Sequence, residues 1–173
     1  MKSFALLTMV LSLCFATPDC RKPGGGTPGL PPEQAAQARR AIVTYLECEE
    51  CEVDQVDAVI KLGQVAVPTL VVTLLEGPPR TNLEVYRRHL TARYRELKQY
   101  EQTHPQVKVP GSEQQYVESY MDNYEALYRV RAATALAAIG GADAKRALEE
   151  ASHMSLRKDV HEAVKVSLEK IKK

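Results

Sequence analysis

From residue 32 onward the sequence shows one helical pattern after another, and it nowhere shows the alternation of apolar and polar residues that marks a strand. Apolar residues recur with the helical period in each segment, and glycine or proline separates one segment from the next. Helices are predicted over residues 33–47, 54–62, 67–77, 81–102, 112–139, 144–152 and 155–172. The sequence therefore predicts an all-α fold in one domain over residues 32–173.

The ends of several predicted helices show capping patterns. Thr81 and Glu84 fit the T-x-x-E pattern of a capping box, and Ser112 and Gln115 fit the related S-x-x-Q pattern. Asp54 is predicted to cap the second helix. The two helices that follow Thr81 and Ser112 are the longest in the chain, and a loop with two prolines joins them. They predict a long helical hairpin.

Two segments of the chain are alike, AVIKLGQVAVPTLVVTLLEG at residues 58–77 and ALAAIGGADAKRALEEASHM at residues 135–154. Ala66 and Leu70 follow a glycine turn in the first segment, and Ala144 and Leu148 follow one in the second. Repeated pairs of helices joined by a glycine turn are typical of α-solenoids.

On these residues the chain resembles the HEAT and HEAT-like repeat family of armadillo-type α-solenoids. VRAATALAAIGGADAKRALEEA is a close match to the degenerate pattern of that family, and AVPTLVVTLL is a partial match. The resemblance implies a short α-α superhelix of HEAT-like helix pairs and a role in binding other proteins. The chain departs from a regular array between residues 77 and 130, where the long hairpin would be inserted.

The N-terminus predicts export from a bacterial cell. Residues 1–16 combine Lys2 with a short apolar run and small residues before a cleavage point after Ala16, which is typical of a signal peptide. Cys14 follows a loose lipobox, so a lipid anchor on Cys14 is the alternative to simple export. Residues 17–31 are rich in proline and glycine and predict a flexible linker. The expected location is the periplasm or the extracellular space.

The charge of the chain is balanced, with 23 basic and 22 acidic residues and a net charge of +1. Such a chain offers no basic surface for nucleic acid, so no nucleic-acid partner is expected. Contact with a membrane is expected only through the lipid anchor.

The run LECEECEV, residues 46–53, holds Cys48 and Cys51 in a C-x-x-C spacing that fits several chemistries. Haem attachment would need a histidine where the chain has Glu52, and a zinc site would need two further ligands. The pair follows the C-terminal end of a predicted helix and lies among four glutamates, which disfavours the thiolate needed for redox catalysis. A local Cys48–Cys51 disulfide is therefore favoured, with a redox pair, a metal site and free thiols as the alternatives.

Tyrosines stand at successive i+4 positions in YVESYMDNYEALY, namely Tyr116, Tyr120, Tyr124 and Tyr128. Each step turns about 40° around a helix, so the four share one stripe, with Val117 and Leu127 within or beside it. We expect the stripe to pack on the apolar positions of the preceding helix, which are Leu83, Tyr86, Leu90, Tyr94 and Leu97. The alternative is an aromatic binding surface, because a tyrosine hydroxyl can also face water or a ligand.

Arginines dominate the charge of the first helix of the hairpin, and acidic residues begin the second. Antiparallel packing would place opposite charges along the edges of the apolar seam, where an exposed pair contributes less than about 1 kcal/mol. The alternative is that Arg87, Arg88 and Arg95 form an anion-binding patch.

The chain contains none of the common catalytic fingerprints, such as G-x-S-x-G, H-E-x-x-H or the P-loop. We therefore predict no catalytic residue, no metal ligand and no cofactor. The sequence predicts a non-enzymatic module for protein–protein interaction in the cell envelope, whose protein partner is unknown. The alternatives are a thiol-redox or enzyme-accessory protein that uses Cys48 and Cys51, and a small-ligand carrier that uses the tyrosine stripe.

Overall fold

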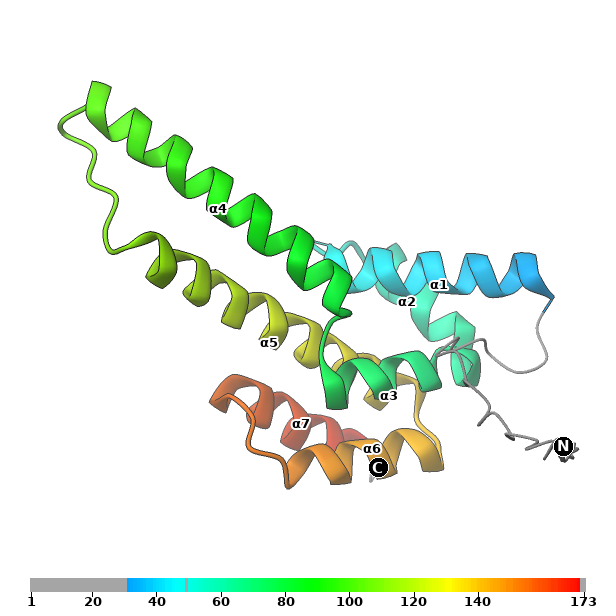
Figure 1. Cartoon of the computed structure of the whole chain (residues 1–173). Helices are drawn as coiled ribbons and strands as arrows, with labels where there is room; N and C mark the ends of the chain where they lie inside the picture. The colour runs from blue at the N-terminus through cyan, green and yellow to red at the C-terminus, as the bar shows by residue number, and fades with distance from the viewer. Residues whose placement is uncertain (1–30, 49, 172–173) are drawn as a thin grey trace, which may run out of the picture.

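A computed structural model describes residues 31–48 and 50–171 of the chain. Within these residues the structure has seven α-helices, one short 3-10 helix and no strand, which confirms the predicted all-α class (Figure 1). The helices are α1 (Pro32–Glu47), α2 (Val53–Leu62), η1 (Gly63–Val65), α3 (Val67–Glu76), α4 (Arg80–Thr103), α5 (Glu113–Ile139), α6 (Ala142–Ser152) and α7 (Lys158–Ile171). The predicted signal peptide, Cys14 and nearly all of the predicted linker lie outside the described residues.

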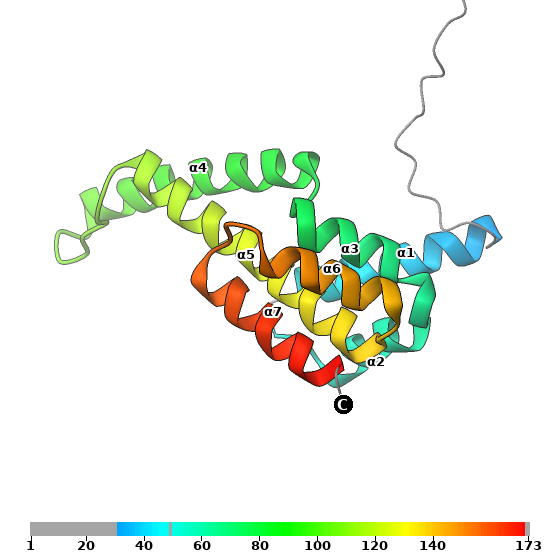
Figure 2. The ribbon, with the colours of Figure 1, turned by 90° about the horizontal axis from the view of Figure 1, so that it is seen from below.

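The described helices form two regions, which we name the body and the arm. The arm consists of α4, the loop at residues 104–112 and residues 113–125 of α5, and it projects away from the other helices in both views (Figures 1 and 2). The body consists of the remaining helices and of residues 126–139 of α5. Helix α5 therefore runs through both regions, and the predicted long hairpin is present.

The body has a large apolar core. Leu70 and Leu74 of α3, Leu136 of α5, Leu148 of α6 and Val164 of α7 have no exposed surface. Helix α5 lies at the centre of this core, against α3 on one side and α7 on another. Its small residues Ala132, Ala133 and Ala135 are buried there, where they let the neighbouring helices approach closely.

The arm has a much smaller core. Leu90, Val117 and Met121 are its buried residues, and Leu83, Tyr86 and Tyr116 pack around them while remaining partly exposed. Helix α4 packs chiefly on α5. The arm is thus a two-helix structure with one apolar seam and little else to bury.

Two arginines of α5 hold the ends of other helices. The Arg129 guanidinium donates from Nη1 to the carbonyls of Leu74 (2.5 Å) and Leu75 (2.7 Å), near the C-terminus of α3. The Arg131 guanidinium donates from Nη1 to the Leu46 carbonyl (2.8 Å), near the C-terminus of α1. These carbonyls have no partner inside their own helix, and a cation also suits the negative end of the helix dipole.

Gly77, which ends α3, has a φ of 89°, and a side chain there would meet Arg129 at 3.2 Å. A glycine is therefore needed at this position both for the backbone conformation and for the arginine contact.

The two segments with the repeated sequence pattern lie against each other in the body. Helix α2 packs on α5 and helix α3 packs on α6, and the Gln64 amide donates to the Gly140 carbonyl (3.1 Å) where the two glycine turns meet. The segments Val53–Val65 and Val67–Glu76 meet at an angle of 105°. The HEAT-like superhelix stays a prediction.

The structure corrects several predicted helix starts. Glu52 is the N-cap of α2 and forms a capping box with Gln55, so Asp54 is not the cap. Helix α4 begins at Arg80 after Pro79, so the T-x-x-E pattern at Thr81 does not form a capping box. The start of α2 is thus determined by the earlier residue Glu52, and the start of α4 by the preceding Pro79, in place of the expected caps. Helix α6 begins two residues before the predicted residue 144, and α7 begins three residues after the predicted residue 155.

None of the described helices is by itself long and apolar enough to cross a membrane. The bent pair Val53–Val65 and Val67–Glu76 passes that test by length and composition. Several of its apolar residues, including Val59, Leu70 and Leu74, are buried in the core of the body.

Candidate functional site

Tyrosines of α4 and α5 make ring contacts with one another in two groups, which we together name the tyrosine seam. Tyr86 stacks on Tyr124, with ring centres 4.3 Å apart. Tyr94 contacts Tyr116 at 5.4 Å between ring centres, and Tyr116 and Tyr124 contact Tyr120 and Tyr128 at 4.6 and 4.8 Å. The predicted packing of the stripe on α4 is therefore present.

Among the seam tyrosines of α5, exposure is lowest at Tyr128 in the body and highest at Tyr120 in the arm. Tyr128 is 2% exposed and belongs to the core of the body, Tyr124 and Tyr116 are partly buried, and Tyr120 is 44% exposed. Leu127, expected within or beside the stripe, is 40% exposed because its position on α5 points away from the seam. Met121, rather than Leu127, is buried together with Val117 and Leu90. Its i+4 spacing from Val117 was the feature of the sequence that could have predicted this burial.

A chain of hydrogen bonds connects the seam to helix α1. The Tyr124 hydroxyl donates to the Tyr128 hydroxyl (3.0 Å), which donates to Oε1 of Glu47 (2.7 Å). The Asn82 amide donates to the same Oε1 (3.0 Å). Burial, together with the hydrogen bonds to Tyr124 and Glu47, raises the pKa of Tyr128, so its phenol stays protonated and remains a donor.

Beside this network lies a hollow of about 480 Å³, which we name the base hollow. Its walls come from the end of α1, the first turns of α4 and the middle of α5. The lining residues are Glu47, Asn82, Val85, Tyr86, His89 and Tyr124. Sequence reasoning missed Glu47 and Asn82, because single polar residues far apart in the chain give no periodic signal.

A second hollow, of about 510 Å³, lies near the end of the arm, and we name it the tip hollow. It is lined mainly by apolar groups of the loop and of both helices, including Leu97, Val107, Val109, Tyr116 and Tyr120. The Tyr94 hydroxyl donates to the Gly111 carbonyl (2.8 Å), so a tyrosine of the seam also holds the loop that forms this hollow.

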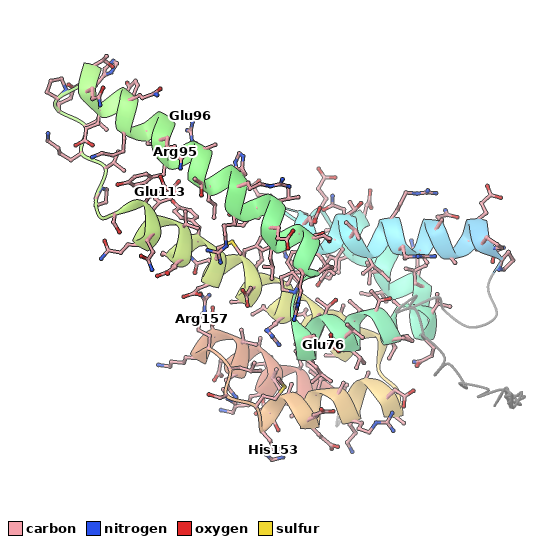
Figure 3. All side chains as sticks on the ribbon, viewed as in Figure 1. Glu76, Arg95, Glu96, Glu113, His153 and Arg157 are labelled. Carbon is pink, nitrogen blue, oxygen red and sulfur yellow. A yellow bond between two sulfur atoms is a disulfide. The ribbon has the colours of Figure 1, made fainter. Side chains whose placement is uncertain are left out.

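The three arginines of the predicted anion patch have different environments. The Arg95 guanidinium pairs with the Glu113 carboxylate across the arm at 3.1 Å, and Figure 3 labels both side chains between α4 and α5. Arg87 and Arg88 are exposed on α4, and within the described residues neither forms an ion pair. Of the expected opposite charges along the seam, Arg95 and Glu113 form the pair that links the two helices of the arm.

Cys48 and Cys51 lie between α1 and α2 with their sulfurs at disulfide distance and their Cα atoms 5.2 Å apart. Cys48 is the C-cap of α1, at the negative end of that helix. The position of the two cysteines is compatible with the predicted local disulfide.

An apolar groove of about 630 Å³ also runs along the body between α1 and α3, with Val43 and Val72 exposed in its wall. Among the described residues, no group of three or more histidine, cysteine or acidic side chains is placed to hold a metal ion.

No family model, no curated protein and no solved structure matches this chain. Its function is therefore inferred from the arrangement of its own residues.

Proposed function

We propose that this protein is a non-enzymatic interaction module of the bacterial cell envelope, and that its arm contacts a protein partner. The proposal rests chiefly on one observation: the projecting hairpin exposes tyrosines and arginines, and one of these tyrosines, Tyr120, lines an apolar hollow. Tyr100 and Tyr120 are 49% and 44% exposed. Tyrosine and arginine are enriched in the residues that contribute most to protein–protein binding.

The tip hollow supports the same proposal. It lies beside Tyr120 and between the loop and α5, where a side chain of a partner would be surrounded on several sides. Residues that fill such pockets near the centre of an interface give most of the binding energy, while the charged residues around them set the orientation. Lys108 of the loop is such a charge in the lining of the tip hollow.

We propose that the body is a HEAT-like scaffold, that the chain is exported by its N-terminal segment, and that Cys48 and Cys51 form a stabilising disulfide. The redox alternative has less support, because the pair lies at the C-terminal end of α1 near several glutamates, where a thiolate is disfavoured.

The interaction is tested by affinity capture from the envelope fraction of the native host with three versions of the protein. The double variant Tyr100→Ser/Tyr120→Ser changes the arm, and Val72→Ser changes the groove of the body as a matched control. Capture of a specific protein should fall at least about tenfold with the arm variant and stay unchanged with the groove variant. Equal capture by all three versions, or loss only with Val72→Ser, would contradict a role for the arm.

The disulfide is tested by the intact mass of protein from the native host, alkylated before and after reduction. The proposal expects Cys48 and Cys51 to be oxidised in every molecule. A reduced or mixed pair would contradict the stabilising disulfide and favour the redox alternative.

A further inference from the structure

The base hollow contains a carboxylate that is held in place but not neutralised. The Tyr128 hydroxyl and the Asn82 amide, both uncharged donors, donate to Oε1 of Glu47, and Oε2 receives neither bond. Within the described part of the chain, no lysine, arginine or histidine forms an ion pair with Glu47. A carboxylate oriented by neutral donors keeps its negative charge available to a ligand.

Aromatic rings form another part of the wall. Tyr86 and Tyr124 stack at 4.3 Å and both line the hollow with Glu47. The face of a tyrosine ring carries partial negative charge and attracts a cation placed within about 6 Å of it. A carboxylate next to tyrosine rings is thus suited to a guanidinium or ammonium group. Of the basic residue types, His89 lines the hollow and no lysine or arginine does.

The end of helix α1 adds to this preference. Glu47 is the last residue of α1, where the helix dipole gives partial negative charge. Arg131 reaches the same helix end but donates to the Leu46 carbonyl rather than to Glu47. The cation supplied by the chain therefore covers a backbone carbonyl and leaves the side-chain carboxylate for another molecule.

We propose that the base hollow binds the guanidinium or ammonium group of a basic side chain from the protein partner. Glu47 would supply the counter-charge, Asn82 and Tyr128 would orient it, and Tyr86 and Tyr124 would supply the ring faces. This inference rests on the proposed function, because it assigns to the partner of the arm an exposed lysine or arginine. The base hollow would require a basic residue of the partner, whereas the tip hollow, which is lined mainly by apolar groups, would not.

The test is an NMR titration of the full chain with N-acetyl-arginine methylamide and, as the neutral isostere, N-acetyl-citrulline methylamide. We expect saturable shifts for the arginine probe at amides around Glu47, Asn82 and Tyr86, and no saturable shifts for the citrulline probe. Glu47→Gln keeps an acceptor for Tyr128 and Asn82 but loses the charge, so affinity for the arginine probe should fall about tenfold. Glu84→Gln removes the same charge from an exposed position of α4 outside the hollow, so it should leave the affinity unchanged.

The site would be excluded if both probes shifted the same amides equally, or if Glu47→Gln bound the arginine probe like the unaltered protein. A second arm of the experiment compares a five-residue peptide with one central arginine with the small polyamine spermidine. Tighter binding of the peptide at the same amides supports a protein partner. Tighter binding of spermidine would overturn that assignment, although the cation site would stand.

Failure of this inference can be told apart from failure of the proposed function. If capture depends on Tyr100 and Tyr120 while the arginine probe does not bind, the arm is an interaction site without a cation pocket. If the probe binds through Glu47 while no capture depends on the arm, the pocket exists and the proposed interaction is wrong.

Discussion

The body and the arm share one helix but are held together differently. In the body, α5 contributes Ala132, Ala133 and Leu136, which are fully buried among α3, α6 and α7. In the arm, the same helix contributes tyrosines that contact one another and one neighbouring helix. Small and branched apolar residues fill a core completely, whereas tyrosines leave a hydroxyl and often a ring edge exposed.

This difference separates stability from binding along one continuous helix. The buried half of α5 fixes the direction in which the arm projects, because Arg129 and Arg131 also attach it to the ends of α3 and α1. The arm can then present an incompletely buried surface without unfolding the domain. We expect substitutions in the body to lower the free energy of unfolding most, and substitutions in the arm to affect binding more than stability.

The largest effect is expected for Leu136→Ala in the core of the body. Leu136 has no exposed surface, so the variant leaves a cavity and should lower the free energy of unfolding by about 3 kcal/mol, measured by urea denaturation. Leu127→Ala, on the exposed side of the same helix, is the control and should change it by less than about 0.5 kcal/mol.

The same substitution in the arm gives the direct comparison. Leu90→Ala should be less costly than Leu136→Ala, because the small cluster around Leu90 lies close to solvent and can collapse. An equal or larger loss of unfolding free energy for Leu90→Ala would show that the arm is as important to stability as the body.

Arg129→Met is expected to have the next largest effect. The variant keeps an apolar stem but removes both hydrogen bonds to the Leu74 and Leu75 carbonyls, which should lower the free energy of unfolding by about 2 kcal/mol. Arg87→Met, which removes an exposed arginine of the arm, is the matched control and should have little effect in the same urea experiment. Similar effects for the two variants would mean that Arg129 does not attach α5 to α3.

Helix positions and the burial of α1 could be predicted from the sequence. Five residues recur with the helical period on one side of the first helix and are its five buried residues, namely Ala35, Ala38, Ile42, Tyr45 and Leu46. This works because burial on one side of a helix leaves a periodic record in the chain. The seam was predictable for the same reason, since its tyrosines recur every four residues.

The base hollow could not be predicted from the sequence. Glu47, Asn82 and Tyr128 are separated by 35 and 46 residues, and they meet because α1, α4 and α5 converge where the arm leaves the body. Helix starts were also less predictable than helix positions. At Thr81 a correct capping pattern is present, but Pro79 precedes it and α4 has already begun at Arg80.

The capping patterns at Thr81 and at Ser112 differ in outcome, and this difference gives a further prediction. In the arm, the Ser112 hydroxyl accepts from the Gln115 backbone N–H (3.2 Å), and the Gln115 side chain accepts from the Ser112 N–H (2.9 Å). Ser112→Ala should therefore lower the free energy of unfolding by about 1 kcal/mol. Thr81→Ala should have almost no effect, because α4 begins before it. Thermal denaturation of the two variants measures the difference, and equal losses would contradict the observed start of α4.

The smallest effect is expected for the ion pair between Arg95 and Glu113. Both side chains are substantially exposed, so their coupling should be about 0.3 kcal/mol in a double-mutant cycle with alanine at each position. In 1 M NaCl, where the Debye length is about 3 Å, the coupling should fall further. The single variant Glu113→Ala should lose more than the coupling, because Glu113 also lies in the first turn of α5. A coupling that stayed strong in high salt would mean that charge, rather than the tyrosine seam, holds the two helices of the arm together.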